Sequence, residues 1–260
     1  MKDLLSNIRM DLPRAFFSYA FFLSVFGVCM ALFFSIVPQL RASANGSMQL
    51  DVLNLYNLAH FQGFSILSAI FATVPYSLSF CMDWNNQFIR SVIIRTDVRS
   101  YSISKVLTSA LAGGSAVALG EALFIIFLYL NFSLVGANDL NSLEYGNLIS
   151  EGHFIIFFVL QTLIKFFAAA FFATLALWIS TYFNNVFVTL AVPVLSFYFL
   201  ITIPLMIGIS MRWFYNALMG GAYANNLYAS ALYSFLICCL LIILMGILAT
   251  EQIRRRLEHG

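Results

Sequence analysis

Two ionisable residues, Glu121 and Lys165, lie inside long apolar stretches of the chain and are the first candidates for chemistry. Counted from the expected outer ends of those stretches, they are roughly 15 and 18 Å deep at about 1.5 Å per helical residue. An unpaired charge at that depth costs at least about 2.5–3.5 kcal/mol, so we expect Glu121 and Lys165 to pair inside the protein. The pair would either hold two helices in register or take part in the passage of a cargo.

Few other residues have the types and spacing that catalysis or metal binding requires. No histidine belongs to an H-E-x-x-H motif, and we expect all three to be solvated at span ends or in the tail: His60, His153 and His259. The alternative for His60 and His153 is a metal or proton site near the outer surface. The four cysteines fall in or beside apolar stretches, where they would behave as small apolar residues: Cys29, Cys81, Cys238 and Cys239. We therefore predict no catalytic site and no metal site.

Motifs for acyl or phosphoryl chemistry are also missing from the sequence. It contains neither a G-x-S-x-G elbow nor a G-x-x-x-x-G-K-[ST] phosphate loop. The chain therefore has no phosphate loop of its own for ATP hydrolysis. We expect no cofactor on this chain, and any coupling to ATP would come from a separate subunit.

The composition indicates which solvent surrounds these residues. Of the 260 residues, 62% are hydrophobic and 9% are charged, with a net charge of +2 and a mean hydropathy of +0.91. Soluble domains carry about 25% charged residues, so the apolar excess must face lipid. Nucleic-acid binding, disorder and a disulfide-stapled secreted fold are excluded for want of a basic excess, a polar bias and enough cysteines.

The fold class is predicted to be an all-α integral membrane protein with six transmembrane helices. Each stretch has the roughly 20 apolar residues that a span needs: 15–38, 61–81, 106–132, 153–178, 186–208 and 228–250. A short polar turn at 180–185 makes the fourth and fifth spans a hairpin. Pro193 and Pro204 should bend the fifth span, and the third has glycines expected to mark close helix packing: Gly113, Gly114 and Gly120.

The positions of lysine and arginine predict the orientation, because positive residues are retained on the cytoplasmic side. With the N-terminus inside, ten of them are cytoplasmic: Lys2, Arg9, Arg14, Arg90, Arg95, Arg99, Lys105, Arg254, Arg255 and Arg256. Only Arg41 and Arg212 would then be outside. We expect a multi-pass protein of the cell membrane with both termini in the cytoplasm and the first span acting as a signal anchor.

We expect residues 1–260 to form one transmembrane domain, because no segment between the spans has room for another. Residues 1–14 read as an amphipathic segment that Pro13 ends or redirects before the first span. Residues 209–227 form an outer semi-polar segment that is too polar to cross the bilayer.

Residues 82–105 form the long cytoplasmic loop and have the pattern of a basic amphipathic helix. Its apolar side chains recur at three- and four-residue spacing: Trp84, Phe88, Ile89, Val92 and Ile93. Its positive charges are Arg90, Arg95 and Arg99. Such a helix would either lie on anionic lipid headgroups or dock onto a cytoplasmic partner.

The loop and the topology together resemble the permease subunit of type-2 ABC exporters. The residues that carry the resemblance are Phe80, Asp83, Arg99, Tyr101 and Lys105. The sequence departs from the family pattern at Asn85 and Asn86, where a glycine is often found, and at Thr96 and Asp97, where a proline and a small residue are common.

The resemblance implies a homodimer, or a heterodimer with a sister permease, carried on two cytoplasmic ABC ATPase subunits that bind ATP and magnesium. The loop would be an amphipathic coupling helix whose residues meet the ATPase: Asp83, Trp84, Phe88, Arg90, Arg95, Arg99, Tyr101 and Lys105. Membrane lipid is the other expected partner, and nucleic acid is not one.

Several functions remain open at this stage. The 28 phenylalanines and 12 tyrosines suit an amphipathic or hydrophobic cargo, such as a peptide, a lipid or a drug, better than a bare ion or a sugar. The main hypothesis is an exporter permease driven by a separate ATPase. The alternatives are an ion-coupled secondary carrier that uses Glu121 and Lys165, and a non-transporting immunity or assembly protein.

Overall fold

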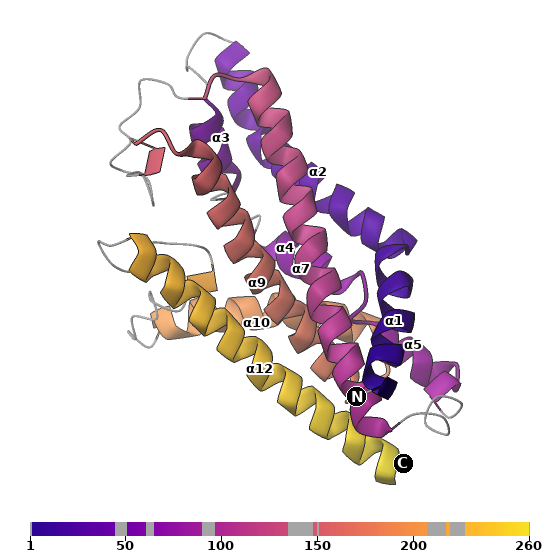
Figure 1. Ribbon diagram of the computed structural model, residues 1–260. Helices are drawn as coiled ribbons and strands as arrows, with labels where there is room; N and C mark the ends of the chain where they lie inside the picture. The colour runs from indigo at the N-terminus through magenta and orange to yellow at the C-terminus, as the bar shows by residue number, and fades with distance from the viewer. Residues whose placement is uncertain are drawn as a thin grey trace.

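The computed structural model folds the chain into a body of packed helices (Figure 1). It describes residues 2–44, 51–60, 65–89, 97–134, 148–149, 151–206, 217–218 and 227–259. The helices are α1 (Lys2–Phe16), α2 (Tyr19–Ala44), α3 (Val52–Ala59), α4 (Ser65–Thr73), α5 (Ser79–Asn85), α7 (Val98–Asn131), α9 (Phe154–Ser180), α10 (Val186–Met206) and α12 (Leu227–His259).

Four segments in this part of the chain are long and apolar enough to cross a membrane: Tyr19–Ser43, Val98–Asn131, Phe154–Ser180 and Ala229–Leu257. The predicted all-helical class is confirmed, and these helices fit a multi-pass membrane protein. Six spans are not confirmed. The expected second span, 61–81, contains α4, turns at 74–78 and the start of α5, and the apolar part of α10, Val186–Leu200, is shorter than the four.

The first span begins later than the sequence predicts. Pro13 does not end α1, which continues to Phe16. Pro13 removes the one hydrogen bond that its N–H would donate to the carbonyl of Arg9, but the helical pattern continues beyond it, since the N–H of Phe17 donates to the carbonyl of Pro13 at 3.0 Å. The chain then turns, and the hydroxyl of Ser18 accepts a hydrogen bond of 3.1 Å from the backbone N–H of Phe21, as the residue before a helix typically does. α2 accordingly starts at Tyr19.

α7 is the central helix, and it packs against α1, α2, α4, α9 and α12. Its glycines allow this, which confirms the predicted close packing. A Cβ atom built on Gly113 would stand closer than van der Waals distance to the carbonyl oxygen of Ala72 and to Cβ of Ala173. One built on Gly120 would lie 2.6 Å from Cβ of Val28. The absent side chains therefore let α2, α4 and α9 approach the backbone of α7.

We expect Gly113→Leu to destabilise the protein by at least about 1–3 kcal/mol, because the added atoms meet a backbone carbonyl that cannot rotate away. Thermal unfolding of the purified protein in detergent measures the effect. Ala229→Leu adds three carbon atoms, one fewer than Gly113→Leu, at an exposed position of α12 and should leave the melting temperature nearly unchanged. Equal melting temperatures for the two variants would contradict the packing argument.

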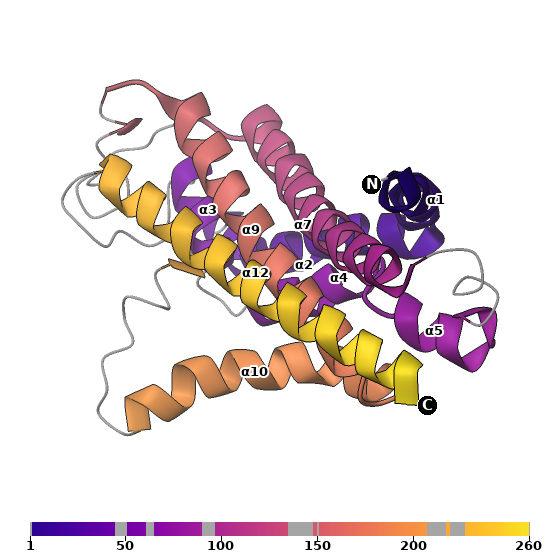
Figure 2. The same ribbon diagram turned by 60° about the horizontal axis from the view of Figure 1, so that its bottom comes forward.

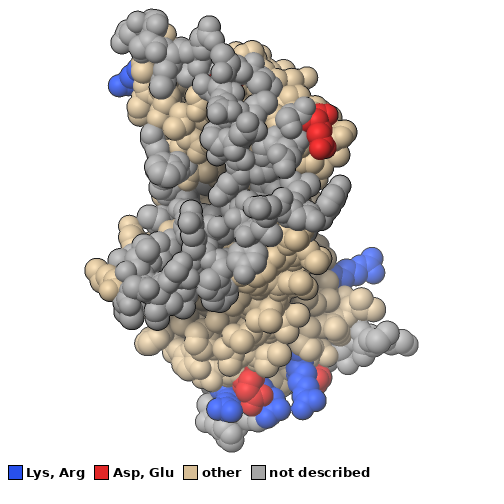
Figure 3. Space-filling view, turned by 90° about the vertical axis from the view of Figure 1, so that its left-hand side faces the viewer, with Lys and Arg blue, Asp and Glu red and all other residues tan. Residues whose placement is uncertain are grey.

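The outward faces of the long helices are apolar. On α12, side chains spaced three or four residues apart are 61–62% exposed: Leu232, Leu236, Leu240, Ile243 and Ile247. Figure 3 shows most of the charged side chains of one face gathered at its lower end, with a tan surface of other residues above them. A surface of this kind suits contact with hydrocarbon rather than water.

The two ends of the body are built differently. Both termini lie at one end, near α5 (Figures 1 and 2). At the other end, the N–H of Val52 donates a 2.9 Å hydrogen bond to the carbonyl of Ser133, which ties the start of α3 to the end of α7.

The predicted turn between the fourth and fifth stretches is confirmed, since α9 ends at Ser180 and α10 begins at Val186. Figure 2 shows α10 set apart below α12, and α10 packs on α9 and α4.

Candidate functional site

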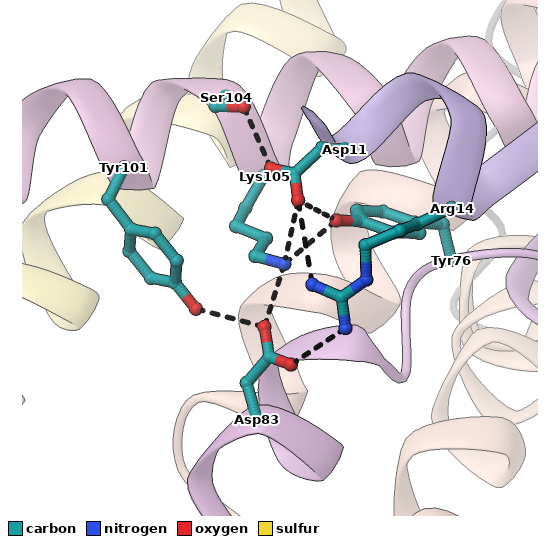
Figure 4. Close-up of polar contacts among 7 residues, drawn as sticks. All are labelled: Asp11, Arg14, Tyr76, Asp83, Tyr101, Ser104 and Lys105. Carbon is teal, nitrogen blue, oxygen red and sulfur yellow. Dashed lines mark hydrogen bonds and ion pairs between the residues drawn. The ribbon is translucent and has the colours of Figure 1, made fainter. Parts of the chain in front are cut away.

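A cluster of seven polar side chains lies at the end of the body that holds the termini (Figure 4). We call it the charge network. It is formed by Asp11 and Arg14 of α1, Tyr76 of the turn after α4, Asp83 of α5, and Tyr101, Ser104 and Lys105 of α7. Segments far apart in the sequence meet here, since Asp11 and Lys105 are 94 positions apart.

Lys105 is the centre of the charge network, and its ammonium group is fully satisfied. An ammonium carries three N–H donors and no acceptor. Its Nζ lies 2.8 Å from Asp83 Oδ2, 2.8 Å from Tyr76 Oη and 3.3 Å from Asp11 Oδ1. Three donors therefore face three acceptors, in a side chain with no exposed surface.

The two buried aspartates of the network also accept hydrogen bonds from several donors. Asp11 also accepts hydrogen bonds from the hydroxyls of Tyr76, at 2.5 Å, and Ser104, at 2.8 Å. Asp83 accepts one from Arg14 at 3.2 Å and one from Tyr101 at 3.3 Å. Asp11 is 1% exposed and Asp83 3%. Charges this deeply buried are stable only when they are paired and hydrogen-bonded, as they are here.

The charges of the network balance. Asp11 and Asp83 carry two negative charges, and Lys105 and Arg14 carry two positive ones. Burial is the largest single influence and lowers the pKa of Arg14, but the attractions of Asp83, Tyr76 and Asp11 together outweigh it, so the pKa lies above the ordinary value. Arg14 therefore stays charged at any physiological pH, and its attraction to Asp83 is present throughout that range. The network locks α1, α5 and α7 together without a net charge.

This geometry changes the interpretation of three residues that the sequence assigns to an ATPase contact. Asp83, Tyr101 and Lys105 are 3%, 2% and 0% exposed, so they face the inside of the chain and present no surface to a partner. The two described ends of the 82–105 loop belong to different helices. Residues up to Asn85 belong to α5, and those from Val98 onward are the first turns of α7.

The other residues of the predicted coupling set lie around the charge network. The guanidinium of Arg256 at the end of α12 sits 4.1 Å from the ring centroid of Trp84 and also donates to the carbonyl of Thr181. Phe88 is 39% exposed, and Arg99 is exposed on the first turn of α7. Arg90 and Arg95 lie outside the described residues, as does most of the 209–227 segment.

A cavity of about 430 Å³ opens beside Trp84. Its walls come from the end of α5, the α9–α10 turn and the end of α12, with Asn85, Gln87, Asn184 and Arg256 among the lining residues. The amides and the guanidinium make part of this wall polar. The cavity therefore lies where the end of α5, the α9–α10 turn and the end of α12 come together, at the end of the body that holds both termini.

A second polar cluster, the Glu121 site, lies between α3 and α7 and consists of Tyr56, His60 and Glu121. The hydroxyl of Tyr56 donates to Glu121 Oε1 at 2.5 Å, and His60 Nε2 lies 3.3 Å from the same oxygen. The sequence interpretation of His60 as a solvated span-end residue is wrong, because its side chain is only 15% exposed and faces this buried carboxylate. Lys165 of α9 attracts Glu121 electrostatically, behind these closer partners.

The sequence reasoning did not find Asp11, Arg14, Tyr76 and Ser104 as members of one site. One signal was available, since Asp11 lies three residues after Ile8 in a segment with an amphipathic pattern. Aspartate is rarely buried unless paired, so an acid beside an apolar face indicates a partner. For the Glu121 site, the signal is the spacing of four residues between Tyr56 and His60, which places both on one helix face.

The described part of the chain is helical, its four long apolar helices fit a multi-pass membrane protein, and a neutral buried charge network lies at one end. Comparison of the chain with protein-family models, curated proteins and solved structures gave no match. The function is therefore argued from the geometry.

Proposed function

We propose that this chain is the membrane-spanning subunit of an ATP-driven exporter. It would move an amphipathic or hydrophobic cargo outward, while a separate cytoplasmic ATPase subunit binds ATP and magnesium. The observation that supports this most directly is the charge network, because it joins both ends of the basic 82–105 loop to each other and to α1.

The mechanical argument starts from the 2.8 Å contact between Asp83 and Lys105. These two residues stand at either side of the loop, on α5 and α7. A force applied to the loop would therefore pass directly into α7 rather than being lost in a slack connection. Because α7 packs against α1, α2, α4, α9 and α12, a displacement of α7 would reach the rest of the body.

The surface around the charge network offers a place for the ATPase. Phe88 is partly exposed and Arg99 is exposed, and the loop adds the positive charges of Arg90 and Arg95. The cavity beside Trp84 lies next to this surface. In this proposal the loop centre docks as an amphipathic helix, and Arg99, Arg90 and Arg95 meet acidic residues of the ATPase.

The proposal includes the finer topology that the sequence indicates. Six spans would cross the cell membrane with both termini in the cytoplasm, the second passing through α4 and α5 and the fifth through α10. Two such chains, identical or sister, would enclose the cargo path. The supporting observations are that both termini lie at the same end as α5 (Figure 1) and that the outward faces of the long helices are apolar.

Copurification tests the proposal. The tagged chain, extracted in a mild detergent from its native membrane, should carry a phosphate-loop ATPase at about equal stoichiometry, and the complex should hydrolyse ATP faster when an amphipathic cargo is added. A complex without such an ATPase, combined with full function of the isolated chain, would overturn the proposal.

An ion-coupled secondary carrier is a second candidate, favoured by the Glu121 site. A buried carboxylate beside a histidine inside a membrane body is the kind of group through which carriers couple ions to transport. Vesicles that contain only this chain distinguish the two candidates. Uptake driven by a pH gradient without any ATPase would favour the carrier, and its absence would favour the exporter.

A further inference from the structure

One ring nitrogen of His60 meets a backbone carbonyl, and the other lies within ion-pair distance of a buried carboxylate. It stands at the C-terminal end of α3, where its Nδ1 lies 2.8 Å from the backbone carbonyl oxygen of Tyr56. On the opposite side of the ring, Nε2 lies 3.3 Å from Glu121 Oε1. A carbonyl oxygen only accepts hydrogen bonds, and so does an ionised carboxylate.

A neutral His60 and an ionised Glu121 together carry one proton fewer than this arrangement of groups calls for. A neutral imidazole ring has a single N–H, so one of its nitrogens presents a lone pair to an acceptor whichever tautomer forms. One added proton removes the conflict, either on the second ring nitrogen or on the carboxyl group of Glu121. The hydroxyl of Tyr56 cannot replace it, because its own proton already points to Glu121 Oε1 at 2.5 Å.

The burial of Glu121 favours a bound proton, whereas the positive charge of Lys165 favours the ionised carboxylate. Its side chain has no exposed surface, and within the described part of the chain its second oxygen, Oε2, accepts no hydrogen bond. An ionised carboxylate with an unmet oxygen in an apolar interior is costly. His60 is 15% exposed, so protons can reach the pair through its ring.

We propose that His60 and Glu121 form a proton-binding site between α3 and α7. The bound proton holds α3 against α7, and its release leaves an imidazole lone pair facing a carboxylate and separates the two helices. In the described part of the chain, the groups that act electrostatically on Glu121 are His60 and Tyr56 of α3 and Lys165 of α9. The site lies at the end of the body opposite the charge network (Figure 1), and its proton chemistry holds for either candidate function.

Amide hydrogen exchange of the full chain in lipid nanodiscs tests the movement. After correction for the intrinsic effect of pH, α3 should exchange about tenfold faster once the pair has lost its proton at high pH. Glu121→Gln should abolish this pH step. The matched control is His153→Asn, because His153 is an exposed histidine before α9, and it should keep the step. A pH-independent α3 in the unaltered chain, or a step that survives Glu121→Gln, overturns the proposal.

A measurement on the unaltered chain guards against a variant that fails to fold. With only three histidines in the sequence, ¹⁵N labelling of histidine gives resolvable ring signals, and His60→Asn identifies the relevant pair. We expect the Nδ1 of His60 to carry a proton over the whole titration. A neutral ring with its proton on Nε2 would contradict the geometry and overturn the proposal.

Discussion

Lys105→Met is expected to destabilise the protein by about 3–5 kcal/mol, the cost of removing one partner from a buried ion pair. Without the ammonium group, Asp11 and Asp83 remain buried with only Arg14 to compensate two negative charges, and the hydroxyl of Tyr76 loses its donor. Methionine fills most of the vacated volume, so the loss is electrostatic rather than steric. Denaturant or thermal unfolding in detergent, together with the amount of protein in the membrane, measures it.

A second substitution separates the charge effect from a general defect. Lys105→Met combined with Asp83→Asn leaves Asp11 and Arg14 as a balanced pair, so the double variant should be more stable than the single one. The surface control is Arg255→Met at the same end of the body, where the side chain is 66% exposed, and it should cost less than about 0.5 kcal/mol. If Lys105→Met is no more destabilising than Arg255→Met, the charge network does not hold the helices together.

The charge network could not be predicted from the sequence, chiefly because α1 is buried on an unexpected face. The sequence predicts only that the N-terminal segment is amphipathic and does not indicate that its polar face is buried inside the body. In the structure, Asn7, Asp11 and Ala15 are buried, whereas Leu5 is 62% exposed. The helix turns its polar face to the charges of α5 and α7, and Leu5 faces outward while Leu4 and Leu12 are partly buried. Local amphipathicity shows that a helix has two faces, but the neighbouring charges decide which one is buried.

The second predicted span shows where an argument from length alone fails. The stretch 61–81 has enough apolar residues to cross a bilayer, but turns at 74–78 interrupt it. Tyr76 occupies that interruption and meets Asp11, 65 positions away. A window of hydropathy records composition and not hydrogen bonding, so it cannot detect a break that a distant carboxylate stabilises. The spans at α2, α7, α9 and α12 were predictable because apolar packing and local propensity agree there.

The partners of Glu121 were predictable only in part. Equal depth in two spans predicted that Glu121 pairs with Lys165, and in the structure Lys165 acts on Glu121 electrostatically. The nearer partners, Tyr56 and His60, come from α3, a helix of eight residues that is too short to be recognised as a span. Charge pairing across a membrane body is therefore easier to infer between long helices than between a long helix and a short one.

Reversing the charges of Arg95 and Arg99 is expected to abolish cargo-stimulated ATP hydrolysis in the proposed complex. Arg99 is exposed on the first turn of α7, so Arg99→Glu changes a surface and leaves the charge network intact. Arg95→Glu adds a second negative charge to the same loop. Like charges placed against acidic residues of an ATPase repel by several kcal/mol, enough to prevent docking. ATPase activity of the reconstituted complex, with and without cargo, is the measurement.

The matched control reverses two exposed arginines elsewhere in the predicted cytoplasmic set. Arg9 of α1 and Arg255 of α12 are both exposed, so Arg9→Glu with Arg255→Glu alters the net charge by the same amount. This variant should keep stimulated hydrolysis, and both variants should insert into the membrane as the unaltered chain does. If the loop variant also retains stimulation, the force cannot enter through residues 82–105, and the connection from Asp83 to Lys105 would serve the stability of the fold alone.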